Sequence, residues 1–98
     1  MQFRFDDGEL GRLYTDPHYS AYYGPNIVKA FRKVIGLIKD AADERDFYKM
    51  KSLHYEKLQG KRSHQRSMRL NQQFRLIIEI EGHGDKTVAV ISVEKHYE

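Results

Sequence analysis

The sequence predicts an α+β fold in which N-terminal helices pack on a small, twisted, mainly antiparallel sheet. Two observations predict it. The apolar residues recur with a helical period up to about residue 64 and alternate with polar residues after it. The chain has 98 residues, which is enough for one core and no second one. We therefore expect a single domain over residues 1–98, with the helices first and the sheet second.

The first elements are short. Phe3 and Phe5 alternate with a polar residue, which predicts an opening strand. Asp6 stands three residues before Glu9, the spacing of a capping box, and predicts that a helix begins there. The apolar residues of this helix, which we expect to be its buried side, are Leu10, Leu13 and Tyr14.

The clearest helix follows Pro25, a residue that suits the first position of a helix. Its apolar stripe has intervals of three and four and consists of Ile27, Phe31, Val34, Ile38 and Ala41. The tyrosine-rich segment 19–24 before it is read as a loop whose rings pack at an edge, rather than as a binding patch. Asp43 is expected to cap a further short helix that extends through Phe47 and Met50.

The second half of the chain predicts strands. A strand begins at Gln65, and its basic residues do not all fit one face, so a bend or bulge is expected there. A second strand presents Phe74, Leu76, Ile78 and Ile80 on one face. The turn cluster 82–85 joins it to a strand over 87–93 as an antiparallel hairpin.

The charge of the chain is unevenly distributed. Residues 49–75 contain eight Lys or Arg against the single acid Glu56, a net charge of +7, while the whole chain carries +3. Blocks of one sign indicate a partner of the other sign, and an extended polyanion such as a nucleic acid fits best.

Composition excludes several classes of function. The chain has no cysteine, which excludes disulfides, thiolate metal sites and thiol nucleophiles and favours a reducing, cytoplasmic compartment. Neither a signal peptide nor a membrane-spanning run is recognisable. The histidines are scattered without a metal-ligand spacing, so neither a metal nor another cofactor is expected.

Three segments together carry a resemblance to a known family. They are residues 58–60 followed by a basic loop, the run Met-Arg-Leu-Asn-Gln-Gln-Phe-Arg-Leu-Ile at 68–77, and Val-Glu-Lys-His at 93–96. This order, two arginine-bearing strands around a short polar turn and then a terminal histidine, resembles the RelE/ParE toxin superfamily, specifically its HigB-like, plasmid-maintenance killer branch. Nearly the whole chain is covered, with Gln59 where relatives often have lysine.

The resemblance implies the toxin of a type II toxin–antitoxin system that acts as a ribosome-dependent mRNA endonuclease and inhibits translation. Such a metal-independent endoribonuclease needs a base, an acid and cations around the phosphate. The implied catalytic residues are His54, Arg69, Arg75 and His96. The implied substrate-binding residues are Lys57, Lys61, Arg62, Arg66, Glu94, Lys95 and Tyr97.

The resemblance also implies partners: a cognate antitoxin, expected to be a HigA-like helix-turn-helix DNA-binding protein, together with the ribosome and mRNA. Operator DNA would be bound only through the antitoxin, and no membrane is involved. Two alternatives stay open. The ParE side of the superfamily shares the fold but poisons DNA gyrase, and a non-catalytic module would only bind RNA or the antitoxin.

Overall fold

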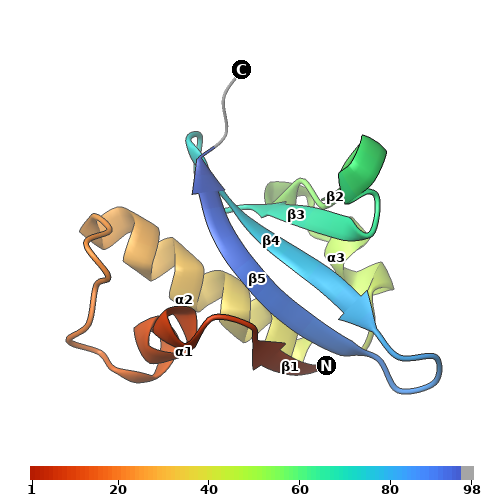
Figure 1. Ribbon diagram of the computed structural model, residues 1–98, viewed down its shortest axis with the longest axis horizontal. Helices are drawn as coiled ribbons and strands as arrows, with labels where there is room; N and C mark the ends of the chain where they lie inside the picture. The colour runs from red at the N-terminus through yellow and green to blue at the C-terminus, as the bar shows by residue number, and fades with distance from the viewer. Residues whose placement is uncertain (96–98) are drawn as a thin grey trace.

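A five-stranded mixed sheet with helices on one side forms the body of the protein, which confirms the predicted α+β class (Figure 1). The computed structural model describes residues 1–95. Its elements in chain order are β1 (Gln2–Phe5), α1 (Gly8–Thr15), α2 (Pro25–Asp40), α3 (Arg45–Lys49), the 3₁₀ turn η1 (Lys51–Leu53), β2 (Glu56–Lys57), the 3₁₀ turn η2 (Gly60–Arg62), β3 (Gln65–Arg69), β4 (Phe74–Glu81) and β5 (Thr87–Lys95).

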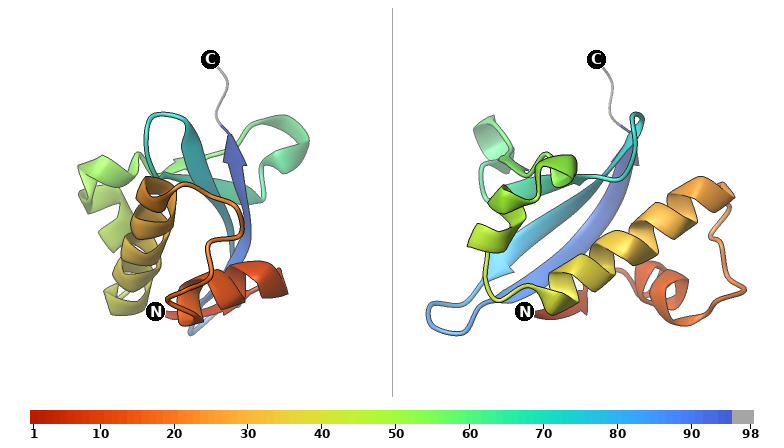
Figure 2. Two further views of the ribbon diagram at one scale, coloured as in Figure 1. Left: turned by 90° about the vertical axis from the view of Figure 1, so that its left-hand side faces the viewer. Right: turned by 180° about the vertical axis from the view of Figure 1, so that it is seen from behind.

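The strands lie in the order β1-β5-β4-β3-β2. All neighbours are antiparallel except β1, which pairs in parallel with β5. The expected hairpin of β4 and β5 is present. The helices between β1 and β2 form the crossover that a parallel pair requires, and Figure 2 shows them on one side of the sheet.

Helix α2 supplies the centre of the core. Every member of its predicted apolar stripe is buried, and Ile35 is buried with them. The facing side of the sheet contributes Met68, Leu76, Ile78, Val88 and Val90 to the same cluster. Each large side chain buried here contributes at most about 1.5 to 3 kcal/mol, so this contact is the main source of stability.

The cap of α1 differs from the prediction. Asp7, not Asp6, is the N-cap, and its carboxylate accepts a hydrogen bond from the amide of Glu9 at 2.8 Å. The amide of Asp6 instead donates to the carbonyl of Val90 at 2.9 Å, which extends the β1–β5 pairing by one residue. The expected capping box is therefore wrong, because a tertiary contact holds Asp6 outside the helix. Of the predicted buried side, Leu10 and Leu13 are buried and Tyr14 is half-buried.

Two further details depart from the prediction. Helix α3 ends at Lys49, before Met50, and its N-cap is Glu44, although the Asp43 carboxylate does accept a hydrogen bond from the amide of Arg45 at 2.8 Å. The register irregularity lies between β4 and β5 at Ile77/Ile78. It does not lie in β3, which pairs regularly with β4 over its whole length.

The loop between α1 and α2 is held by Arg32. Its guanidinium donates to the carbonyls of Leu13, Asp16 and Tyr19 at 3.0 to 3.2 Å, which satisfies the end of α1. Tyr19 and Tyr23 are partly buried, which agrees with the interpretation as edge packing. Tyr22 does not, because it is fully exposed and has a φ of 66°.

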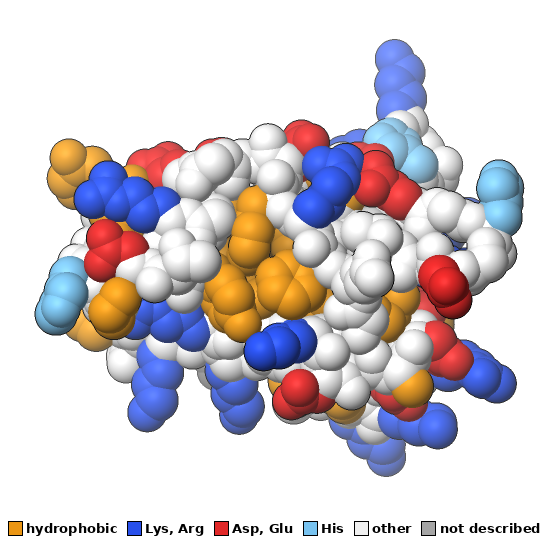
Figure 3. Space-filling model, turned by 90° about the horizontal axis from the view of Figure 1, so that it is seen from below, with side chains coloured by type: hydrophobic (Ala, Val, Ile, Leu, Met, Phe, Trp, Pro, Cys, Tyr) orange, Lys and Arg blue, Asp and Glu red, His pale blue; other side chains and the backbone are white. Residues whose placement is uncertain are grey.

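The outer surface is mixed in character. On the face seen from below, hydrophobic side chains reach the surface in a patch near the middle and charged side chains lie around it (Figure 3). In the part of the chain that the structure describes, no helix has the length and apolar character needed to span a bilayer.

Candidate functional site

The two arginines of the predicted motif lie directly opposite each other on neighbouring strands. Arg69 ends β3, Arg75 follows the first residue of β4, and the register pairs them. The turn between them is shaped by Asn71, whose side-chain oxygen accepts hydrogen bonds from the amides of Gln73 and Phe74, both at 2.8 Å. The motif of two arginine-bearing strands and a polar turn thus forms a tight hairpin with both arginines on the face away from the helices.

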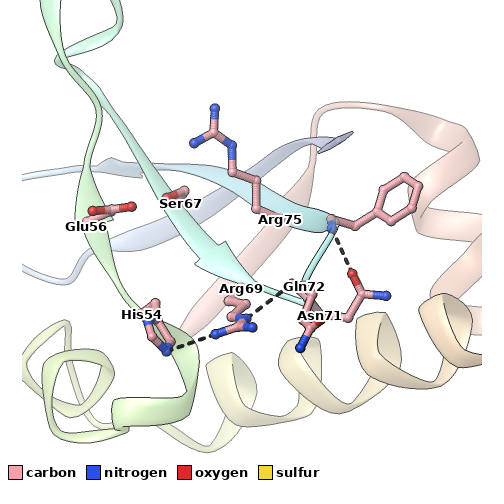
Figure 4. A pocket seen from close by; sticks show the side chains of 8 residues that line it. His54, Glu56, Ser67, Arg69, Asn71, Gln72 and Arg75 are labelled. Atoms are coloured by element: carbon pink, nitrogen blue, oxygen red, sulfur yellow. Dashed lines mark hydrogen bonds between the residues drawn. The ribbon is translucent and has the colours of Figure 1, made fainter. Parts of the chain in front are cut away.

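A cavity of about 290 Å³ opens beside this hairpin. It is lined by His54, Glu56, Ser67, Arg69, Asn71, Gln72, Phe74 and Arg75. Figure 4 shows that β2, β3, β4 and the segment before β2 all contribute to it. Three of the four predicted catalytic residues therefore lie around one cavity, although they are up to 21 positions apart in the sequence.

His54 contacts Arg69 across this cavity. The distance from Arg69 Nη1 to His54 Nε2 is 3.2 Å (Figure 4). A guanidinium only donates, so Nε2 is the acceptor in this contact. His54 also has a left-handed backbone, with φ 45° and ψ 50°, at the end of η1. Such strain in a non-glycine residue is concentrated at functional sites.

The two arginines create a local excess of positive charge. Like charges directly opposite each other on neighbouring strands destabilise a sheet. Figure 4 shows the Arg69 side chain directed toward His54 and that of Arg75 directed away from it. Arg75 also lines a second hollow of about 360 Å³ together with Lys57, Gln59 and Arg62. Arg75 and the acidic Glu56 are common to both hollows, so the two hollows adjoin and form one surface from His54 to the basic loop, which we call the cationic surface after its arginines and lysines.

Arg62 and Glu94, both predicted to bind substrate, bind each other. The Arg62 fork donates to the two Glu94 oxygens at 3.0 and 2.6 Å, and Ser92 Oγ donates to Glu94 at 3.0 Å. The hydrogen bonds from the Arg62 fork, which outweigh the opposite effect of burial, and that from the Ser92 hydroxyl hold the pKa of Glu94 below its ordinary value. This pair fastens η2 to the end of β5, over the outer face of the sheet.

The remaining predicted substrate-binding residues are dispersed. Lys57 and Lys61 are exposed in the basic loop, and Lys95 is exposed at the end of β5. Arg66 alternates with Ser67 and therefore lies on the helix side of the sheet, where its Nε is 3.7 Å from Glu44. It is separated from the cavity by the sheet itself.

Glu44 also accepts a hydrogen bond from the hydroxyl of Tyr55 at 2.7 Å. Burial and this bond raise the pKa of Tyr55. Arg66 thus belongs to a structural cluster with Glu44 and Tyr55. The last two predicted residues, His96 and Tyr97, lie outside the described residues.

The comparison with protein-family models now decides the family. The model described as "RelE-like toxin of type II toxin-antitoxin system HigB" matches residues 2–96. The chain belongs to this HigB-like toxin family. Its family implies a cognate antitoxin as partner. No curated protein matches the chain.

A solved structure confirms the fold of this HigB-like chain. The YoeB/ParE toxin from Agrobacterium tumefaciens is similar to it with a TM-score of 0.57 and 18% sequence identity, over 99% of this chain and 100% of that chain. At this level of identity the likeness shows the fold alone.

Sequence reasoning missed part of the HigB-like cavity. In the sequence Glu56 stands out only as the one acid of the basic segment, but in the structure it pairs with Ser67 and lines the cavity. Asn71 and Gln72 also line it from the turn. The polar turn between the two arginines was the available signal for these two residues. Nothing local marks Glu56, because β2 is only two residues long. Within residues 1–95, no group of three or more His, Asp or Glu side chains is placed to hold a metal ion.

Proposed function

We propose that this toxin is an mRNA endonuclease that cuts RNA on the outer face of its sheet. The observation that carries the proposal is the convergence of Arg69, Arg75 and His54 around one cavity, with the two arginines in direct register. Guanidinium groups at fixed positions suit a phosphate, because each can donate two hydrogen bonds to its oxygens.

The chemistry would use the 2′-hydroxyl of the RNA as nucleophile. A base takes the proton of the 2′-hydroxyl, O2′ attacks the phosphorus, and the 5′-oxygen leaves with a proton from an acid. The products are a 2′,3′-cyclic phosphate and a 5′-hydroxyl end. The arginines stabilise the negative charge that grows on the phosphate oxygens.

His54 is the proposed base, because its Nε2 faces the cavity arginine as an acceptor and an imidazole nitrogen can take a proton. The lone pair of Nε2 is occupied by Arg69 in the absence of RNA, so Arg69 must turn from His54 to the phosphate when substrate binds. Glu56 lines the same cavity and offers a second acceptor. His96, which the family resemblance marks, is the proposed acid.

We further propose that the mRNA is presented by the ribosome, which places the activity in the cytoplasm. The exposed lysines of the basic loop, Lys57 and Lys61, support this, since they extend the cationic surface beyond the cavity toward a larger polyanion. The proposed antitoxin is a HigA-like helix-turn-helix protein, and a neighbouring gene without such a product would argue against it.

The test is to map mRNA 5′ ends in cells that express each variant. Wild type should generate new 5′-hydroxyl ends within translated reading frames, and Arg69→Gln, Arg75→Gln, His54→Asn and His96→Ala should each reduce them about 100-fold. Arg45→Gln is the matched control, because Arg45 is an exposed arginine that pairs with Asp43 outside the cavity and should leave the ends unchanged.

Equal cleavage by wild type and both cavity arginine variants would remove the proposal. Replication arrest without new mRNA ends would favour the gyrase-poisoning alternative. Growth arrest without either effect would favour a binding module. Efficient cleavage of purified RNA without ribosomes would show that the activity does not depend on the ribosome.

A further inference from the structure

Glu94 has two arginine neighbours but pairs with only one of them. On β5 it lies directly opposite Arg75 of β4. Opposite charges in register on neighbouring strands attract each other, so Arg75 is the partner that the sheet itself offers. The carboxylate instead lies in the fork of Arg62, which is 32 positions away in the loop.

The Arg62–Glu94 pair is held from both ends. Glu94 Oε2 also accepts from Ser92 Oγ at 3.0 Å, so the carboxylate accepts three hydrogen bonds that do not involve Arg75. On the other side, Arg62 Nε donates to Gln65 Oε1 at 2.9 Å, and Gln65 Nε2 donates to Glu79 at 3.1 Å. The network therefore fixes the direction in which the Arg62 fork points.

Arg75 attracts the Glu94 carboxylate across the strands but is not hydrogen-bonded to it. Among residues 1–95 its guanidinium forms no ion pair, and its Nε is buried without a hydrogen-bond acceptor. It also borders both hollows of the cationic surface. A buried donor without an acceptor is costly, so an anion that enters either hollow and accepts from Arg75 would be stabilised there.

We propose that Arg62 is a positioning residue that sequesters Glu94, so that Arg75 stays available to a phosphate of the RNA. The identity of the anion as an RNA phosphate rests on the proposed function. The competition of the two arginines for Glu94 does not. Arg62 contacts no RNA in this arrangement. Its loss frees the Glu94 carboxylate, which then pairs with Arg75 across the strands and competes with the phosphate.

A single substitution of Arg62 cannot distinguish direct RNA binding by Arg62 from an effect of Arg62 on Glu94. If Arg62 bound RNA directly, or only held the loop in place, the effect of its loss on RNA affinity would not depend on the charge at position 94. If Arg62 acts through Glu94, removal of the Glu94 charge must restore RNA binding in a variant that lacks Arg62. Glu79 supplies the matched control, because it is a second glutamate of the same network that faces Gln65 rather than Arg75.

The experiment uses the full chain and a single-stranded RNA whose 2′-hydroxyls are methylated, so that it cannot be cut. Arg62→Ala should weaken binding about tenfold, the range of one charge-assisted contact. Arg62→Ala/Glu94→Gln should bind like wild type, and Arg62→Ala/Glu79→Gln should remain weak. Without any ligand, the Arg75 Nε–H signal in the NMR spectrum should shift in Arg62→Ala and return in the variant that also carries Glu94→Gln.

Two results would overturn the inference. One is an Arg62→Ala/Glu94→Gln variant as weak as Arg62→Ala itself, and the other is equal rescue by the Glu79 control. An Arg75 signal unchanged by Arg62→Ala in the free protein would also overturn it, whether or not RNA binds. If wild type leaves mRNA uncut while the predicted NMR shifts and the rescue of RNA binding occur, the proposed nuclease activity is wrong and this inference still holds.

Discussion

Arg69 should contribute little to folding, although it is essential to the proposed site. The perturbation is Arg69→Gln, compared with Arg32→Gln in helix α2. Arg69 is exposed, and within residues 1–95 it donates only long hydrogen bonds, at 3.3 Å to the Asn71 carbonyl and 3.2 Å to His54. It also lies opposite the like-charged Arg75.

The magnitudes follow from these contacts. Removing one of two like charges in register stabilises a sheet by about 0.2 to 1 kcal/mol, which offsets the loss of the two weak bonds. The net change in unfolding free energy for Arg69→Gln should therefore stay within about 0.5 kcal/mol of zero. Arg32→Gln removes three half-buried bonds to carbonyls at the end of α1 and should cost about 2 kcal/mol.

Urea and thermal unfolding of the purified variants measure both values. For a domain of this size, about 1 kcal/mol corresponds to a Tm shift of about 4 to 8 °C, so Arg32→Gln should melt roughly 10 °C lower and Arg69→Gln within a few degrees of wild type. Added salt should reduce any stability gain of Arg69→Gln, because it screens the repulsion in wild type. A loss for Arg69→Gln as large as that for Arg32→Gln would refute the reasoning, because Arg69 would then be a structural residue.

Three further outcomes can be checked on single variants. His54→Asn should keep the unfolding free energy within about 0.5 kcal/mol, because asparagine tolerates the left-handed backbone at this position, while cleavage falls about 100-fold; a large loss of stability would show that the imidazole is structural. Glu94→Gln should cost about 1 kcal/mol in urea unfolding above pH 5. Because the Arg62 fork lowers the pKa of folded Glu94 below its ordinary 4.5, this difference should shrink as the pH falls below 4.5 and vanish once the pH is below the lowered pKa, and a difference that does not shrink on acidification would contradict it. Tyr22→Gly should raise the unfolding free energy by about 0.5 to 1 kcal/mol in thermal unfolding, because glycine adopts a φ of 66° without strain, and a destabilised variant would count against that strain.

The parts of the fold that local patterns determine were predictable from the sequence. The stripe of α2 and the hairpin of β4 and β5 depend on periodicity and turn residues, and both are present. The pairing of Arg69 with Arg75 follows from the same logic, since a tight turn between them brings the two positions into register.

The remaining features depend on contacts that are distant in the sequence. The parallel pairing of β1 with β5 and the hydrogen bond from Asp6 to Val90 have no local signal, which is why the wrong aspartate was assigned as the cap. The Arg62–Glu94 pair depends on how the basic loop folds back over the sheet.

Arg66 is a different case, because its signal was present in the sequence. It has the same strand parity as the buried Met68, so alternation alone places it on the helix side of the sheet. The alternation of the strand therefore argues against a substrate-binding role for Arg66.

The most direct test of the RNA site is a crystal structure of the toxin with a short 2′-O-methylated RNA. We expect a phosphate of the RNA between the guanidinium groups of Arg69 and Arg75, with Arg69 turned away from His54 Nε2. RNA bound on the side of the helices, with the contact between Arg69 and His54 intact, would contradict the proposed site.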